Sequence, residues 1–175
     1  MNAARPDVLD VLDHTQRRDV ALEDRWRSVD HAGLASEVNA VVALLRARGV
    51  HPGDRVVVSL PNSVSSVEAF LACAALGAIW VGVNPSAPIE EKARQCAIVS
   101  PRVVIGASGA YVPAEADLIS VGDGELVAGR CDSLPMRPEL DVPCGIAFSS
   151  GTTGTPKALV HSRAPGRTPW LAPTP

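Results

Sequence analysis

The sequence predicts an α/β fold in which a doubly wound, mostly parallel β-sheet is flanked by helices. Three observations predict this class. Of the 175 residues, 46% are hydrophobic, which is ample for the core of one domain. Short β-branched runs alternate with amphipathic stretches of helical period over about residues 50–106. Proline and glycine stand where one pattern gives way to the next, as expected for right-handed βαβ units.

Before this alternating core, the sequence predicts an arm, a pair of strands and one helix. Residues 1–18 are polar and acidic with weak periodicity, so we expect a short helix or a loose arm. Residues 20–29 fit two short strands. A helix then runs from a cap at Ser28 or Asp30 to about Arg48. Four apolar residues at helical spacing give this helix one buried stripe: Leu34, Val38, Val41 and Leu45.

The alternating core is predicted to contain three strands with a helix in each interval. We expect strands at 56–60, 78–83 and 102–106 and helices at 63–76 and 88–98. Ser65 and Glu68 have the spacing of a capping box at the start of the first of these helices. Gly77 ends that helix. Pro88 suits the first turn of the second helix, because the amide hydrogen that proline lacks would be unpaired there.

The C-terminal part of the sequence is less regular. Residues 117–121 fit one more strand, residues 122–143 read as a loop, and residues 145–148 form a short apolar strand. Residues 162–175 contain four prolines, two arginines and no acidic residue. Proline at this density forbids a helix, so we expect extended, disordered chain there.

Composition and charge exclude several function classes. The net charge is −3 and aromatic residues make up 3% of the chain, so no nucleic-acid partner is expected. The four cysteines form no CxxC pair and the four histidines are scattered, which argues against a zinc or redox centre. The longest uncharged apolar run, residues 69–83, is shorter than the roughly 20 residues of a transmembrane helix. The N-terminus has no signal-peptide pattern, so we expect a cytoplasmic protein.

One segment carries residues suited to chemistry, the nine residues from Ser149 to Lys157. Seven of the nine are serine, threonine or glycine, and the ninth is one of only two lysines in the chain. Glycine lets backbone amides approach an anion closely, hydroxyls donate to phosphate oxygens, and the lysine ammonium supplies a compact positive charge. The pattern predicts a phosphate-binding loop. A flexible, solvated turn between two strands is the alternative interpretation.

Two other nucleotide-binding motifs do not fit the chain. A Walker A loop needs glycine directly before the lysine and Ser or Thr directly after it, but Thr-Pro precedes Lys157 and Ala158 follows it. The glycine pair Gly122 and Gly124 has Val127 where the third glycine of a dinucleotide-binding loop would stand. Neither of these fingerprints is therefore present.

Residues 148–160, FSSGTTGTPKALV, resemble the glycine-rich phosphate loop of the adenylate-forming (AMP-dependent synthetase/ligase) superfamily. Three upstream stretches agree in order and are similar to the first subdomain of acyl-CoA ligases: RGVHPGDRVVVSLPNS, AFLACAALGAIWVGVNP and EEKARQCAIVSPRVVI. The stretch GAIWVGVNP favours acyl-CoA ligases over peptide synthetases. The resemblance covers residues 20–162, and Ala158 departs from it because most members carry glycine there.

The resemblance implies a two-step reaction that uses ATP, with Mg²⁺, a carboxylic acid and coenzyme A. The carboxylate attacks the α-phosphate, pyrophosphate leaves, and the thiol then displaces AMP from the acyl-adenylate. The resemblance implies that seven residues bind the β- and γ-phosphates of ATP: Ser149, Ser150, Gly151, Thr152, Thr153, Gly154 and Lys157. His161 ends the next strand, where some relatives have a histidine near the acyl site. Simple packing is the alternative role for His161.

The family's remaining motifs lie downstream of this loop, so the resemblance implies an incomplete site with no catalytic residue in this chain. We expect an N-terminal arm at 1–18, a partial AMP-binding domain at 19–161 and a disordered tail at 162–175. The free chain is then expected to have no ligase turnover. Three alternatives stay open: a non-catalytic nucleotide- or pyrophosphate-binding module, a subunit completed by a second chain that carries the missing segments, and a degenerate product that folds poorly.

Overall fold

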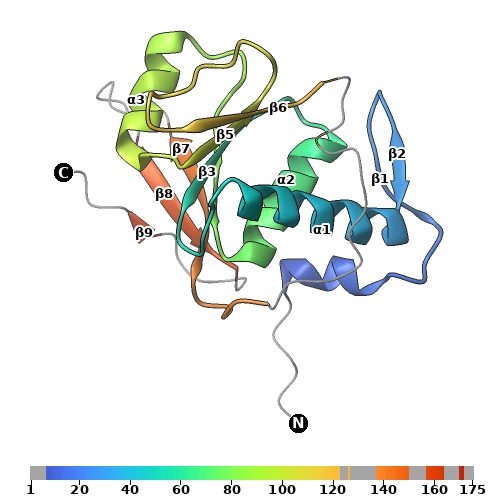
Figure 1. Ribbon diagram of the computed structural model, residues 1–175. Coiled ribbons are helices and arrows are strands. Elements are labelled where there is room, and N and C mark those ends of the chain that lie inside the picture. The colour runs from blue at the N-terminus through green and yellow to red at the C-terminus, as the bar shows by residue number, and fades with distance from the viewer. Residues whose placement is uncertain (1–6, 123–125, 127–136, 150–156, 164–169, 172–175) are drawn as a thin grey trace.

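The chain forms a seven-stranded sheet with helices on both faces and a separate two-stranded sheet beside it (Figure 1). The computed structural model describes residues 7–122, 126, 137–149, 157–163 and 170–171. The small sheet pairs β1 (Val20–Glu23) with β2 (Ser28–Asp30) in antiparallel fashion. The large sheet contains β3 (Arg55–Ser59), β4 (Ile79–Gly82), β5 (Val103–Gly106), β6 (Asp117–Ser120), β7 (Pro143–Ser149), β8 (Lys157–Ser162) and β9 (Trp170–Leu171).

The large sheet is mostly parallel, as the sequence predicts. Its order is β6-β5-β3-β4-β7-β8-β9. The pairs β3–β4, β3–β5, β5–β6 and β4–β7 are parallel, whereas β7–β8 and β8–β9 are antiparallel. The α/β class is therefore confirmed for the parallel part, and an antiparallel hairpin closes one side of the sheet.

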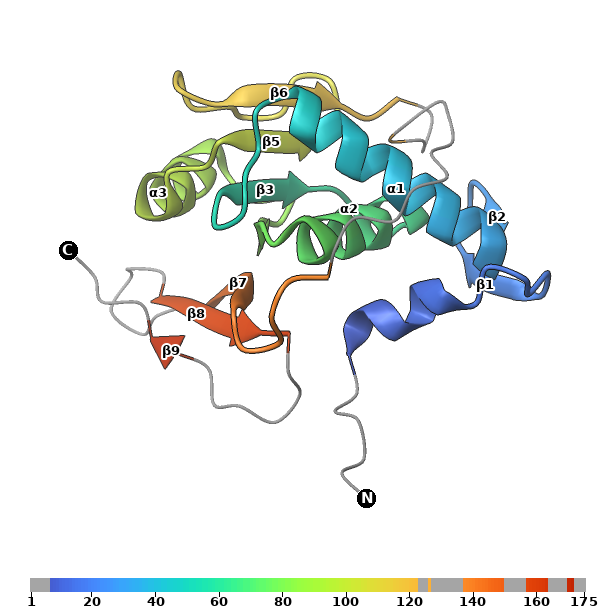
Figure 2. The ribbon, with the colours of Figure 1, turned by 60° about the horizontal axis from the view of Figure 1, so that its bottom comes forward.

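Two hydrophobic cores lie on opposite faces of this sheet. On β3, Val56 and Val58 belong to the core under α1 (His31–Ala47) and α2 (Val64–Leu76), while Val57 belongs to the core under α3 (Ile89–Val99). This alternation follows from the two-residue period of a strand. Figure 2 shows α1 and α2 together and α3 apart from them across the strands. The sheet is thus covered on both faces, which explains its near-continuous valine and isoleucine runs.

Helices α1 and α2 begin and end at residues with clear local causes. Asp30 is the N-cap of α1, and its side chain accepts a hydrogen bond from the Gly33 amide at 2.6 Å. Ser63 is the N-cap of α2 and accepts from the Ser66 amide at 3.2 Å. Gly77 ends α2 with φ +77°, a left-handed conformation that favours glycine.

The predicted capping box at Ser65 and Glu68 is wrong, because α2 has its N-cap two residues earlier, at Ser63. Glu68 lies fully buried on the side of α2 that contacts the β1–β2 hairpin. Its Oε1 accepts from Arg27 Nη2 at 2.6 Å, and Arg27 Nη1 donates to Glu37 Oε2 on α1 at 2.5 Å. The glutamate therefore joins a buried ion site between three elements instead of reaching back to its own helix end.

Helix α3 matches the predicted span of 88–98 to within one residue at each end. Pro88 is the N-cap, one residue before the first helical turn, and makes no side-chain cap. The helix ends at Ser100, which has φ +46°. Arg55 Nη2 donates to the Ser100 carbonyl at 2.8 Å and Arg55 Nε donates to the Val99 carbonyl at 2.7 Å. These two hydrogen bonds pair carbonyls that the helix end leaves free.

The N-terminal arm contains the 3₁₀-helix η1 (Val8–Asp13), which confirms a short helix within residues 1–18. Its N-cap, Asp7, accepts from the Leu9 amide at 3.1 Å, and Asp10 Oδ2 accepts from the Asp7 amide at 3.0 Å. Leu9 and Leu12 are 1% and 2% exposed and join the core that contains α1 and α2. Buried leucines therefore attach the arm to the domain.

The C-terminal part departs from the predicted disorder wherever the structure describes it. Ser162 belongs to β8, Arg163 is buried, and Trp170–Leu171 form β9 beside Leu159 and Val160. Strand β9 pairs at the end of the sheet, where proline-rich chain is compatible with a ladder. None of the helices in the described part of the chain is long and apolar enough to cross a membrane.

Candidate functional site

The β7–β8 hairpin carries the segment predicted to bind phosphate. The register pairs Ser149, the last residue of β7, with Lys157, the first residue of β8. The five residues Ser150, Gly151, Thr152, Thr153 and Gly154 lie outside the described residues, as do Thr155 and Pro156. Ladder pairing therefore brings the two described ends of the predicted loop side by side.

The hairpin brings the two described ends of this loop toward the carboxyl edge of the parallel strands. Strand β7 runs parallel to β4, with Trp80 beside Gly145 and Val81 beside Ile146. Ser149 follows those residues, so it lies toward the edge where the parallel strands β3, β4 and β5 also end. In open α/β sheets, ligands bind outside this edge. The position fits a binding loop better than an arbitrary surface turn.

Lys157 is exposed at the start of β8, and the described residues supply no ion pair or hydrogen bond to its ammonium group. The other lysine, Lys92, is engaged, because its Nζ donates to the Pro85 carbonyl at 2.6 Å. Lys157 is therefore the lysine whose charge is available to an anion at the carboxyl edge.

His161 lies at the opposite end of β8 from Lys157. It pairs in register with Gly145 and is exposed. It lies four positions further along the strand than Lys157, which corresponds to about 13 Å. With Phe70 and Trp80, His161 lines a mainly apolar cavity of about 290 Å³. The structure thus sets His161 apart from Lys157, beside a cavity that Ser162 and Arg163 also line.

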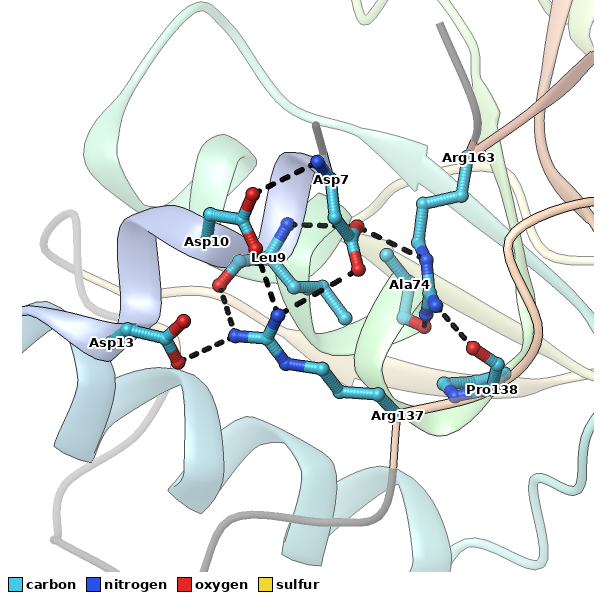
Figure 3. Close-up of polar contacts among 8 residues, drawn as sticks. All are labelled: Asp7, Leu9, Asp10, Asp13, Ala74, Arg137, Pro138 and Arg163. Atoms are coloured by element: carbon cyan, nitrogen blue, oxygen red, sulfur yellow. Dashed lines mark hydrogen bonds and ion pairs between the residues drawn. The ribbon is translucent and has the colours of Figure 1, made fainter. Parts of the chain in front are cut away.

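Sequence analysis missed a cluster of charged residues at the base of the hairpin (Figure 3). The aspartate–arginine cluster consists of Asp7, Asp10 and Asp13 from η1 and its N-cap, together with Arg137 and Arg163. Hydrogen bonds from the Asp7 backbone amide and the Arg137 side chain lower the pKa of Asp10. One signal was visible in the sequence: aspartates spaced by three residues lie on one face of a 3₁₀-helix.

The polar groups of the described residues show whether this site could bind ATP and Mg²⁺. The described ends of the loop offer a hydroxyl and an ammonium group, which are donors for phosphate oxygens. Among the residues that the structure describes, no cluster of three or more histidine, cysteine or acidic side chains could hold a metal. Mg²⁺ commonly keeps substrate phosphates and water as ligands, so these residues fit a nucleotide-bound metal.

The family described as AMP-binding enzyme matches residues 11–165, almost the whole of the described fold. The chain belongs to the AMP-binding enzyme family. The resemblance of the phosphate loop to the adenylate-forming superfamily is thereby confirmed, and the match extends from the second half of η1 to the first residues after β8.

Two relatives of this AMP-binding chain are ligases or synthetases. It is 33% identical over 169 residues to a fatty acid–[acyl-carrier-protein] ligase, MmaC, of Mycobacterium marinum, covering 86% of this chain and 32% of that protein. It is 30% identical over 176 residues to acetyl-coenzyme A synthetase of Xanthobacter autotrophicus, covering 79% of this chain and 27% of that protein. The chain therefore spans a third or less of the length of these relatives.

A solved structure shows the same fold. The N-terminal subdomain of NpsA from Klebsiella oxytoca, in complex with 3-hydroxybenzoyl-AMSN, superposes with a TM-score of 0.73 at 24% identity. The match covers 90% of this chain and 41% of that one. The described AMP-binding fold thus corresponds to part of a larger N-terminal subdomain.

Proposed function

We propose that this chain supplies the polyphosphate-binding part of an ATP-dependent acid–thiol ligase of the acyl-CoA synthetase type. The observation that carries the proposal is the β7–β8 hairpin. It sets Ser149 beside Lys157 at the carboxyl edge of the sheet, and the Lys157 ammonium is exposed. Family membership supports the reaction class, in which ATP activates a carboxylate as an acyl-adenylate.

The loop acts on the leaving group in this proposal. Attack of a carboxylate on the α-phosphate expels pyrophosphate, and charge then accumulates on the β- and γ-phosphate oxygens. Donors already aimed at those oxygens stabilise this charge without reorganising during the reaction. We assign this role to Lys157 and to the hydroxyls and backbone amides of Ser149, Ser150, Gly151, Thr152, Thr153 and Gly154. Mg²⁺ bound to the nucleotide would neutralise part of the same charge.

The thiol acceptor is proposed to be coenzyme A. The acetyl-coenzyme A synthetase relative supports this choice, whereas the relative from Mycobacterium marinum is described as acting on an acyl-carrier protein. We assign no catalytic role to His161, because it lies far down β8 from Lys157 and lines an apolar cavity. A contact with the acyl group is the role that this position supports.

Isolated, the 175-residue chain is proposed to bind ATP without turning it over. The partial AMP-binding domain would occupy residues 19–161, and a separate chain that carries the rest of the family sequence would complete the reaction. The second candidate function is a non-catalytic nucleotide- or pyrophosphate-binding module. It is favoured by the described site itself, which offers anion-binding groups at the ends of the loop.

Calorimetry with Mg-ATP tests the proposal, using Lys157→Ala and the matched control Lys92→Ala. Both substitutions remove one lysine charge, but Lys92 donates to Pro85 and lies on α3. Loss of one charge-assisted contact should weaken ATP binding about tenfold or more for Lys157→Ala. Binding should stay at the wild-type level for Lys92→Ala. Equal losses in both variants, or no ATP binding by the wild type at millimolar concentration, would refute the proposal.

Exchange of labelled pyrophosphate into ATP separates the two candidate functions. The isolated chain should show no acid-dependent exchange. Exchange that appears after a chain carrying the downstream family segments is added would favour the ligase subunit. Binding without exchange under both conditions would favour the non-catalytic module.

A further inference from the structure

The β7–β8 hairpin has a short attachment to the rest of the sheet. Its pairing with β4 consists of two register positions, Trp80 with Gly145 and Val81 with Ile146. The hairpin itself continues to Ser149 and Lys157 beyond these positions. Ile146 and Ala158 of the hairpin are also buried in the core under α3. The contacts at the base of the hairpin therefore add to this packing in fixing where Ser149 and Lys157 lie.

Arg163 connects the base of the hairpin to three other segments. It follows directly after β8, and its side chain is 2% exposed. Its Nε lies 3.1 Å from Asp7 Oδ1, whose side chain is 6% exposed. The guanidinium also donates to the Ala74 carbonyl at 3.4 Å and to the Pro138 carbonyl. One side chain thus joins β8 to the N-cap of η1, to the last turn of α2 and to the segment before β7.

Arg137 makes a second set of contacts from the segment that leads into β7. Its Nη1 donates to Asp10 Oδ1 at 2.9 Å, and its Nη2 donates to Asp13 Oδ1 at 2.5 Å and to the Leu9 carbonyl at 3.0 Å. In Figure 3 the aspartates of η1 point toward the two arginines that flank the hairpin. Both strands of the hairpin are therefore bound at their base by the same short helix.

The leucines of η1 explain why this helix can act as a fixed support. Leu9 and Leu12 are buried in the core shared with α1 and α2. Their spacing of three residues puts them on one side of a 3₁₀-helix, and Asp7, Asp10 and Asp13 share another side. The apolar side thus attaches η1 to the domain, while the acidic side remains for the arginines.

We propose that Asp7 and Arg163 are positioning residues, which hold the base of the β7–β8 hairpin on η1 and thereby help to set where Ser149 and Lys157, the described ends of the phosphate loop, lie. The ion pair acts through the hairpin, since Arg163 and Lys157 stand at opposite ends of β8. The last step, from hairpin to nucleotide, rests on the proposed function.

The pair is sensitive to removal of either charge. Both side chains are nearly fully buried, so Asp7→Asn leaves the Arg163 charge without its partner, whereas Arg163→Gln leaves Asp7 with Arg137 Nη1 at 3.8 Å. Asn is the appropriate replacement for Asp7, because it remains a good N-cap for η1 while losing the charge. The effect of losing the Asp7 charge can then be measured without also losing the N-cap of η1.

Amide hydrogen exchange in the complete 175-residue chain tests the attachment directly. Asp7→Asn and Arg163→Gln should each accelerate exchange of the β7–β8 ladder amides about tenfold or more, with little change in β3 and β5. Because the two residues act as one pair, the double variant should exchange no faster than the faster single variant. Equal acceleration in all strands, or no acceleration in the hairpin, would overturn the proposal.

A control variant and the second member of the pair keep the test decisive. Asp19→Asn breaks the exposed pair with Arg17 and should leave hairpin exchange unchanged. If Asp7→Asn does not fold, Arg163→Gln carries the test, because it removes the other member of the same pair. Hairpin exchange at the wild-type rate in Arg163→Gln would then count against the proposal.

Calorimetry with Mg-ATP reads out the effect on the loop. Asp7→Asn should bind ATP about fivefold more weakly than the wild type and than Asp19→Asn, within the range of indirect coupling. Wild-type affinity in Asp7→Asn, despite faster hairpin exchange, would overturn the positioning role. Failure of the wild type to bind ATP refutes the proposed function instead, and the exchange data then decide the attachment alone.

Discussion

Replacing Glu68 by glutamine should change how the stability of the protein depends on pH. Glu68 is fully buried on α2, and its carboxylate shares Arg27 with Glu37. Burial, followed by a hydrogen bond with Glu37, raises the pKa of Glu68 from 4.5 to about 7, although Arg27 acts in the opposite direction. The folded protein therefore retains a proton that the unfolded chain releases in mildly acidic solution.

The size and sign of the effect follow from linkage. Below pH 4.5 both states hold the proton, and above pH 7 neither state does. Between these values the folded state binds more protons, so the contribution of this group to stability falls as the pH rises. A pKa raised from 4.5 to about 7 corresponds to about 3 kcal/mol of unfolding free energy lost across this window. A glutamine side chain at this position resembles the protonated acid and has no such proton to lose.

Urea unfolding of the wild type and Glu68→Gln at pH 5 and pH 8 measures the difference. The two proteins should be about equally stable at pH 5, and Glu68→Gln should be more stable at pH 8 by about 3 kcal/mol. Glu90→Gln, an exposed replacement in the first turn of α3, is the matched control and should show no such change. A stability difference between Glu68→Gln and wild type that is the same at both pH values would refute the reasoning, because the buried carboxyl would then titrate normally.

The remaining predictions concern the backbone, the core and a thiol. Gly77→Ala should lower the urea unfolding free energy by about 1–2 kcal/mol, because φ is +77° and a Cβ would lie 3.2 Å from Pro138 Cγ. Leu45→Ala should cost about 2–5 kcal/mol in the same assay, since Leu45 is 0% exposed and fills the core beneath α1. Cys73 should stay unlabelled by a thiol reagent until urea unfolds the chain, with mass spectrometry as the readout, because burial strongly raises the pKa of its thiol. Smaller losses for Gly77→Ala and Leu45→Ala, or labelling of native Cys73, would contradict these arguments.

The sequence predicted most of the fold because its signals are local. The helical spacing of four apolar residues predicted the buried face of α1, and all four are at most 1% exposed. The preference of glycine for left-handed backbone at helix ends predicted that α2 ends at Gly77, and Gly77 has this left-handed φ. The β-branched run at residues 56–58 became β3 at the centre of the sheet. Each of these features depends on residues within a few turns of one another.

Sequence reasoning failed where a distant residue competes for a local group. The spacing of Ser65 and Glu68 satisfies the capping pattern, yet Glu68 binds Arg27 from the β1–β2 hairpin. Ser63 takes the cap in its place. Asp24, from the same hairpin, also accepts the Val64 amide at 2.7 Å, and this hydrogen bond is the largest cause of its lowered pKa. The local cap at Ser63 starts α2, and the hydrogen bond to Asp24, which no local pattern contains, adds to it.

In the candidate site, too, the part made of neighbouring residues could be predicted from the sequence, and the part made of distant residues could not. The phosphate loop was recognisable because its residues are consecutive, and a hairpin returns its two described ends to one register position, Ser149 beside Lys157. Its support was not recognisable, because Asp7 and Arg163 come from opposite ends of the chain. An ion pair between chain ends has no periodicity, and only the spacing of the aspartates indicated that η1 has an acidic side.

Because these supporting contacts come from distant residues, grafting the loop sequence alone onto another hairpin would not reproduce its position relative to the sheet. The ladder between β4 and β7 fixes the strand direction of the hairpin, but it holds only two register positions. Arginines beside both strands of the hairpin bind η1, and η1 is attached to the core by Leu9 and Leu12. We therefore expect Ser149 and Lys157, the described ends of the loop, to shift when the contacts of η1 with the hairpin base are removed, because the same short helix is also packed on α1 and α2.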